Sequence, residues 1–153
     1  GYNVGNSIVD DNNIDFCKRM LNQYGDKIVL PVDIITDKGA RKVSDIKDNE
    51  CGYDIGSGTI KIFSDILKDA KRCIISGPMG VYEDKKYSNG TKKIYTVLKD
   101  NKVKTLVGGG DSASSVNNLG FKGVFYHVST GGGATLDYLS GKTLPGIDVI
   151  MEK

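Results

Sequence analysis

The chain has 153 residues, which suits one domain of ordinary size or part of a larger one. Its 21 lysines and arginines against 19 aspartates and glutamates give a net charge of +2, which argues against a basic nucleic-acid-binding surface. No apolar run reaches the roughly 18 residues of a membrane span, and the first residues lack the pattern of a secretory signal. Three cysteines without CxxC spacing and one histidine argue against structural zinc and suit a reducing compartment.

The predicted elements alternate between helices and strands along the chain. Apolar spacing predicts a first helix over 12–24, and the β-branched run 27–35 is typical of a strand buried on both faces, although Pro31 interrupts it. Residues 37–54 are polar without a period, and we expect a loop there. The pattern then predicts helices at 59–71, 91–100 and 111–118, strands at 73–75, 105–107 and 124–128, and a last helix ending near residue 139.

This alternation predicts an α/β fold, with a parallel sheet in a Rossmann-like, three-layer arrangement and helices on both faces. His127 lies in the apolar run 125–128, so we expect it to be a buried or supporting histidine rather than a catalytic base.

Three glycine-rich turns follow consecutive predicted strands, at 76–80 (Ser-Gly-Pro-Met-Gly), 108–112 (Gly-Gly-Gly-Asp-Ser) and 129–134 (Ser-Thr-Gly-Gly-Gly-Ala). The carboxyl ends of parallel strands share one edge of a sheet, so these turns should converge on one cleft. Glycine lets the backbone approach a ligand closely, and a helix start beyond it offers free N–H groups and a positive dipole end. The turns therefore predict a polyphosphate site.

Asp111 and Ser112 have two interpretations at this point. A carboxylate beside a phosphate is reasonable if Mg²⁺ lies between them, and the serine could contact phosphate. Either residue could instead simply cap the helix that begins there. None of the turns has the GxxxxGK[ST] pattern of a P-loop, and no GxGxxG follows the first strand.

Seven segments occur together, in one order, across nearly the whole chain: 30–33 (Leu-Pro-Val-Asp), 54–56 (Asp-Ile-Gly), 77–83 (Gly-Pro-Met-Gly-Val-Tyr-Glu), 90–92 (Gly-Thr-Lys), 108–112, 127–134 and 144–146 (Leu-Pro-Gly). In this combination the sequence resembles the C-terminal, nucleotide-binding domain of the phosphoglycerate kinase family. The resemblance implies reversible phosphoryl transfer between MgATP and 3-phosphoglycerate, giving 1,3-bisphosphoglycerate and MgADP.

The resemblance also implies roles for the residues that would hold the nucleoside. Gly52, Tyr53 and Val81 correspond to positions that flank the adenine, and Pro78 shapes the turn near the ribose. Glu83 corresponds to the acceptor of the ribose hydroxyls, a task that suits a carboxylate. Ser76 stands where the family usually has asparagine, and the stretch 56–59 replaces a more usual Gly-Pro.

A second set of roles concerns the phosphates and the metal. Gly109, Gly110, Asp111 and Ser112 correspond to the loop that holds the Mg²⁺–phosphate group, with Asp111 as the metal ligand. Gly131, Gly132 and Gly133 correspond to the helix start that meets the transferring phosphoryl group. This chemistry depends on positioning and charge neutralisation, for which glycine N–H groups and Mg²⁺ are adequate.

Nothing in residues 1–153 matches the family's N-terminal domain, which supplies the 3-phosphoglycerate site and a catalytic arginine, or the two strand–helix units that open its C-terminal domain. We therefore expect a partial domain with about four of six strands, inactive alone, cytoplasmic and monomeric like its family. Strand 27–35 should either pair with strand 73–75 across the missing centre or face another polypeptide. The alternatives are a non-catalytic module that binds MgADP or a protein partner, and an unrelated α/β dehydrogenase domain.

Overall fold

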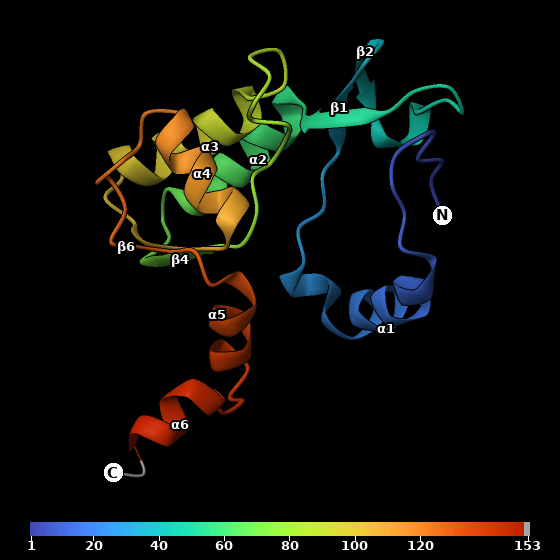
Figure 1. Cartoon of the computed structure of the whole chain (residues 1–153). Helices are drawn as coiled ribbons and strands as arrows, with labels where there is room; N and C mark the ends of the chain where they lie inside the picture. The colour runs from blue at the N-terminus through green and yellow to red at the C-terminus, as the bar shows by residue number, and fades with distance from the viewer. Residues whose placement is uncertain (152–153) are drawn as a thin grey trace.

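The structure is a computed structural model that describes residues 1–151, and it is α/β as predicted (Figure 1). A body of helices and a parallel sheet is joined to a smaller antiparallel sheet and to helices at both ends of the chain. The helices are α1 (Ile14–Tyr24), α2 (Ser57–Leu67), α3 (Asn89–Asp100), α4 (Gly110–Asn118), α5 (Gly132–Leu139) and α6 (Pro145–Met151), with short 3-10 turns at Asp11–Asn13, Gly25–Lys27 and Val43–Asp45. The strands are β1 (Asp33–Thr36), β2 (Gly39–Lys42), β3 (Gly52–Ile55), β4 (Arg72–Ile75), β5 (Lys104–Gly108) and β6 (His127–Ser129). No helix within residues 1–151 is both long and apolar enough to cross a bilayer.

The parallel sheet has the order β4-β5-β6 and confirms the last three predicted strands. Its two crossovers run through α3 and α4, and both helices lie on one face of the sheet, whereas α5 lies on the other (Figure 1). Two crossovers that progress in the same direction with the same hand place their helices on the same face. The core forms where the first face meets α2, α3 and α4, around Tyr95, Leu98, Val107 and Val116. The last strand runs over His127–Ser129 rather than 124–128, because only residues 127–129 pair with β5.

The prediction of a parallel strand at 27–35 is wrong. Residues 28–31 pair with nothing, and β1 begins at Asp33 in a separate antiparallel sheet of order β2-β1-β3. Strand β1 therefore does not pair with β4, contrary to the first of the two expected arrangements. A β-branched apolar run favours an extended backbone, but a sheet forms only where a neighbouring strand can accept its hydrogen bonds.

The prediction of a loop over residues 37–54 is also wrong, since these residues include β2 and most of β3. A tight turn joins β1 to β2, where the Thr36 hydroxyl donates to the carbonyl of Gly39 over 2.9 Å and Gly39 has a φ of +113°. Polar residues along these strands conceal the period of two that would have revealed them.

The ends of the chain lie away from the body. Helix α1 has no buried residue and is joined to the antiparallel sheet by extended segments, and α5 and α6 project away from the parallel sheet (Figure 1). The exposed surface is 10,380 Å², whereas a compact monomer of 16.5 kDa exposes about 7,500 Å². Much apolar surface is therefore left uncovered in this chain.

Candidate nucleotide-binding site

The second and third glycine turns lie against each other at the carboxyl ends of β5 and β6. The backbone N–H of Gly109 donates to the carbonyl of Ser129 over 2.9 Å. A methyl group added to Gly132 would lie 2.9 Å from the Cα of Gly109, so the two loops touch backbone to backbone. Only glycine fits this approach, and Gly109 also needs glycine because its φ is +110°.

Two helix starts meet at this contact. Helix α4 follows Gly109 and helix α5 follows Gly131, and neither start has a hydrogen bond from a side-chain cap. The interpretation of Asp111 or Ser112 as a helix cap therefore has no hydrogen bond to support it. Two uncapped starts concentrate positive potential and free N–H groups at one place, which suits an anion.

Asp111 and Ser112 occupy different environments in the first turn of α4. Asp111 is exposed, so its carboxylate is accessible to a ligand. Ser112 is only 2% exposed, and its carbonyl accepts a hydrogen bond from the Ser115 hydroxyl. The predicted direct phosphate contact through the Ser112 hydroxyl would require that side chain to become accessible.

The first glycine turn forms a separate cavity with strand β3. Four predicted nucleoside-binding residues line this cavity of about 340 Å³ together: Gly52, Tyr53, Pro78 and Val81. The N–H of Val81 donates to the carbonyl of Tyr53 over 2.9 Å, which holds the turn against the strand. Tyr53 gives the cavity one aromatic residue, and its ring stacks on Tyr87 with centroids 4.7 Å apart.

A buried carboxylate that the sequence did not reveal holds this turn in place. Asp54 is 6% exposed and accepts a hydrogen bond of 2.8 Å from the N–H of Gly90, at the start of α3. A side chain at Gly80 or Gly90 would overlap the Asp54 carboxylate, which explains both glycines. Burial raises the Asp54 pKa above its ordinary value, against the hydrogen bonds from Gly90 and Ile55 that lower it. The segments 54–56 (Asp-Ile-Gly) and 90–92 (Gly-Thr-Lys) are thus held together by the hydrogen bond between Asp54 and Gly90.

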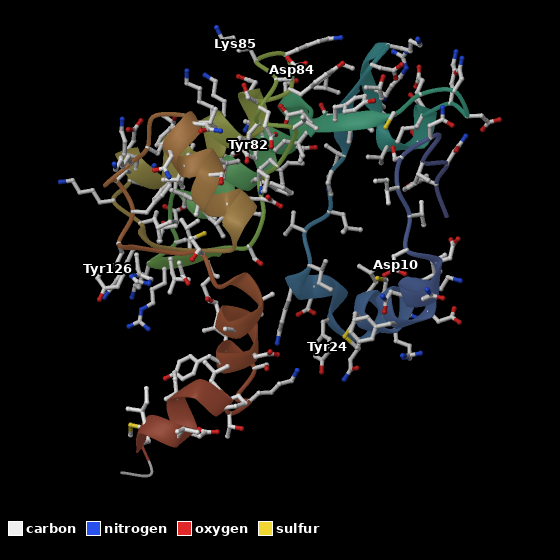
Figure 2. The ribbon with its side chains drawn as sticks, in the orientation of Figure 1. Asp10, Tyr24, Tyr82, Asp84, Lys85 and Tyr126 are labelled. Atoms are coloured by element: carbon white, nitrogen blue, oxygen red, sulfur yellow. The ribbon has the colours of Figure 1, made fainter. Side chains whose placement is uncertain are left out.

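Glu83 lies beyond this turn and lines a different cavity of about 680 Å³, together with its neighbour Tyr82. The structure therefore does not bring Glu83 into the cavity lined by Tyr53 and Val81. Tyr82 is only 8% exposed, and burial raises the pKa of its phenol, whereas Glu83 is exposed. Figure 2 shows Tyr82 within the helical body, whereas Lys85 extends away from it.

The third glycine turn, residues 129–134, also borders a cavity on the face of the parallel sheet opposite α3 and α4. Gly131 lines a cavity of about 330 Å³ with residues of β5, β6, α5 and α6, among them Leu106 and His127. His127 is exposed, so the expectation of a buried histidine is wrong. Its register partner is Leu106, and both face α5 rather than the α3–α4 core. Gly132 touches the α4 loop, while Gly133 has open space around it.

The residues present fit the metal that the resemblance implies. No group of three metal-ligating side chains occurs among residues 1–151, as a cage built from protein alone would require. Mg²⁺ bound with a nucleotide instead keeps waters and phosphate oxygens and needs only one or two carboxylates. The exposed carboxylate of Asp111, beside two uncapped helix starts, is a suitable ligand of this kind.

These features define an α/β protein with glycine turns at the carboxyl ends of parallel strands, an arrangement typical of nucleotide-binding folds. The sequence profile described as phosphoglycerate kinase matches residues 1–142, and the chain belongs to the phosphoglycerate kinase family. Membership confirms the resemblance and rules out an unrelated dehydrogenase domain.

Similar proteins include a phosphoglycerate kinase of Clostridium botulinum (strain Loch Maree / Type A3), which is 42% identical over 164 aligned residues. One of Lactobacillus delbrueckii subsp. bulgaricus is 43% identical over 161. Each alignment includes all of this chain, and the chain spans 41% and 40% of these relatives.

Solved structures show the same likeness. Phosphoglycerate kinase from Coxiella burnetii matches 97% of this chain with a TM-score of 0.89 at 27% identity, and the match spans 41% of that structure. The enzyme from Pyrococcus horikoshii OT3 matches 92% of the chain with a TM-score of 0.81 at 28% identity, over 36% of that structure. The folded arrangement described above is therefore that of the family.

Proposed function

We propose that residues 1–153 form part of the C-terminal nucleotide-binding domain of a phosphoglycerate kinase, the glycolytic enzyme that transfers a phosphoryl group reversibly between MgATP and 3-phosphoglycerate. The observation that carries the proposal is the contact of two uncapped helix starts at Gly109 and Gly132 in a chain of this family. Free N–H groups from two directions suit the β- and γ-phosphates of a nucleotide.

Each candidate residue has a role that its environment supports. Tyr53 and Val81 would contact the adenine in the cavity that they share with Gly52 and Pro78. Glu83, which is exposed, would accept hydrogen bonds from the ribose hydroxyls. The adenine cavity and the cavity lined by Glu83 are separate, so a nucleoside would have to reach from one to the other.

The phosphate groups would lie along the two helix starts. The backbone N–H groups of Gly110 and Gly133 would orient the phosphates. Gly131 and Gly132 would shape the loop, since their N–H groups donate to the Ser129 hydroxyl and the Thr130 carbonyl. Gly109 would keep the loop free of side chains, with the buried Ser112 beneath it. Asp111 would hold Mg²⁺, which when bound supplies neutralisation of phosphate charge. The free N–H groups at the start of α5 would stabilise charge on the transferring phosphoryl group, because donors fixed by a helix need no rearrangement during transfer.

We also propose that these residues alone bind nucleotide without transferring phosphoryl. The resemblance assigns 3-phosphoglycerate binding and an arginine to parts of the family enzyme that this chain does not match. The complete enzyme would act in the cytoplasm, where its family carries out glycolysis.

Calorimetric titration of the 153-residue chain with ADP, with excess Mg²⁺ and with EDTA, tests the proposal. Removing the Asp111 charge with Asp111→Asn should weaken MgADP binding by about tenfold or more and leave metal-free ADP unchanged, because a charge-assisted contact is lost. Asp148→Asn, in the first turn of α6, is the matched control. Absence of nucleotide binding by the unchanged chain contradicts the proposal, and so does an Asp111→Asn effect independent of metal. Turnover of ATP with 3-phosphoglycerate would contradict the inactivity of the isolated chain.

A further inference from the structure

The inference concerns Thr91, the threonine of the Gly-Thr-Lys segment, which has no role in the function proposed above. Thr91 lies in the first turn of α3 and is fully buried. Its hydroxyl oxygen accepts a hydrogen bond of 3.0 Å from the backbone N–H of Met79. Thr96, further along the same helix, instead donates to the carbonyl of Lys92 four residues before it, which is the usual bond of a threonine within a helix. The Thr91 hydroxyl therefore binds a segment outside its own helix.

That segment is the turn 78–81, which lines the cavity proposed for the adenine. All four residues of the turn line this cavity of about 340 Å³, and its other lining residues are Ile34 of β1 and residues 52–55 of β3. The cavity thus lies between the turn and the antiparallel sheet. The position of the turn relative to β3 therefore sets the width of the space that an adenine would enter.

Three hydrogen bonds connect the turn, β3 and the start of α3 to one another. At one end of the turn, the N–H of Val81 donates to the carbonyl of Tyr53 on β3 over 2.9 Å. At the other end, the N–H of Met79 donates to Thr91 on α3. The Asp54 carboxylate completes the arrangement by holding the start of α3 to β3. Removing the Thr91 hydroxyl would release the Met79 end of the turn and leave the other two bonds in place.

The turn needs this second anchor because its own sequence is flexible. It follows Gly77, which has a φ of +144°, and it contains Gly80, and glycine has more backbone freedom to lose than other residues. A turn that the fold already holds in place loses less conformational entropy when a ligand binds. This advantage belongs to the base, which the turn would contact, and not to the phosphates, which would bind the N–H groups of α4 and α5.

We propose that Thr91 is a positioning residue, which holds the turn 78–81 to α3 and thereby sets the affinity of the cavity for the adenine base. The proposal rests on the nucleotide-binding function proposed above. Thr91 acts through Met79 and does not itself line the cavity. Its loss should therefore weaken binding of the base and leave binding of the phosphates unchanged.

The test compares the unchanged chain with Thr91→Val, which keeps the shape of the side chain and removes the hydrogen-bond acceptor. Calorimetric titration with MgADP and with magnesium pyrophosphate, which has two linked phosphates but no nucleoside, separates the base from the phosphates. We expect Thr91→Val to bind MgADP about 2- to 10-fold more weakly, the range for one hydrogen bond, and to bind magnesium pyrophosphate as before.

Two further variants separate the hydroxyl from the rest of the side chain and from the helix. Thr91→Ser keeps the hydroxyl and should restore the MgADP affinity of the unchanged chain. Thr96→Val removes a hydroxyl hydrogen bond from the same helix without touching the turn, so it should change neither affinity. A dispersed amide NMR spectrum shows that each variant is folded.

Each other outcome overturns the proposal in a recognisable way. Equal weakening of both ligands by Thr91→Val, or loss of its dispersed spectrum, would show that Thr91 supports the whole fold. Unchanged MgADP affinity would show that the turn is held without Thr91, and failure of Thr91→Ser to restore binding would show that the hydroxyl is not what matters. In these cases the unchanged chain still binds MgADP, and only this inference fails. If the unchanged chain does not bind MgADP, the proposed function fails, and the inference fails with it.

Discussion

At the scale of single residues, Asp33 shows how one side chain connects two parts of the chain. Its carboxylate accepts hydrogen bonds from the N–H groups of Gly58 (2.9 Å) and Thr59 (2.7 Å) at the start of α2, a helix whose own N-cap residue is glycine. A methyl group at Gly56 would overlap that carboxylate, which accounts for the glycine there. Asp33 therefore caps a helix from a distant strand.

The Asp33 carboxylate should make stability depend on pH. Burial raises its pKa, but hydrogen bonds from the Thr59 hydroxyl and from the N–H groups of Gly58 and Thr59 outweigh burial, so the folded pKa is lower than the unfolded one. The stabilisation is then complete above the unfolded pKa of about 3.9 and is lost as pH falls through the folded value.

Asp33→Ala should lower the free energy of unfolding at pH 7 by about 1 kcal/mol, the usual cost of a lost cap. Urea denaturation of both proteins at pH 7 and near pH 3 measures the difference, which should shrink at the lower pH. Asp26→Ala, in the exposed turn after α1, should change little. A difference between the Asp33 variant and the unchanged chain that is the same at both pH values would contradict this account.

At the scale of elements, the two glycine turns show why a loop sequence is constrained by its neighbour. Gly109 has a φ of +110°, and Gly132 lies against its backbone, so neither position tolerates a side chain without movement. Gly133, one residue further, has a helical conformation and nothing within 4 Å of an added methyl group. These three glycines thus differ in the reason that each position requires or tolerates glycine.

Alanine substitutions should separate these cases. Gly109→Ala should cost about 1–3 kcal/mol of stability because of backbone strain, and Gly132→Ala should also destabilise because its methyl group meets the Gly109 backbone. Gly133→Ala should be neutral or stabilising by up to about 1 kcal/mol, since alanine favours the helix. Urea denaturation of the three variants provides the measurement. Destabilisation by Gly133→Ala equal to that of the others would indicate that the loops do not meet as described.

At the scale of the whole molecule, stability is distributed unevenly. The core around Tyr95, Leu98 and Val107 is well buried, whereas α1 contributes no buried residue. The face of the parallel sheet opposite α3 and α4 is partly open, with Ile74 51% exposed, and the outer edge of β4 is unpaired within residues 1–151. An isolated helix of 11 residues is marginal in water, so α1 should open independently of the core.

Hydrogen exchange measured by NMR should detect this difference. Amides of α1 should exchange within about tenfold of the unfolded rate, while those of α3 and β5 should be protected by several orders of magnitude because they open only with the core. Amides in α5, which has no buried residue but packs on β5 and β6, should lie between the two. Protection of α1 equal to that of α3 would contradict independent opening of α1, because it would require that α1 be buried against another surface.

Much of the fold and part of the site could be predicted from the order of residues alone. Apolar periodicity identified α1 to α3, and apolar runs before glycine turns identified β4 and β5, because both signals are local. The glycine turns also indicated where α4 and α5 begin. The glycine-rich segments also located loops that the structure brings into contact at Gly109 and Gly132. Parallel strands end on one edge of a sheet, so this proximity follows from topology.

Only the tertiary structure decided which segments pair and which side chains are buried. The run 28–31 has the composition of a central strand but lies without a partner, and the polar segments around β2 and β3 form strands because β1 lies between them. Asp54, Tyr82 and His127 likewise have environments that composition does not reveal: Asp54 and Tyr82 are buried, and the histidine is exposed on the open face of the parallel sheet. Local sequence sets the preference of each segment, but strand pairing and side-chain burial depend on contacts between residues far apart in the chain.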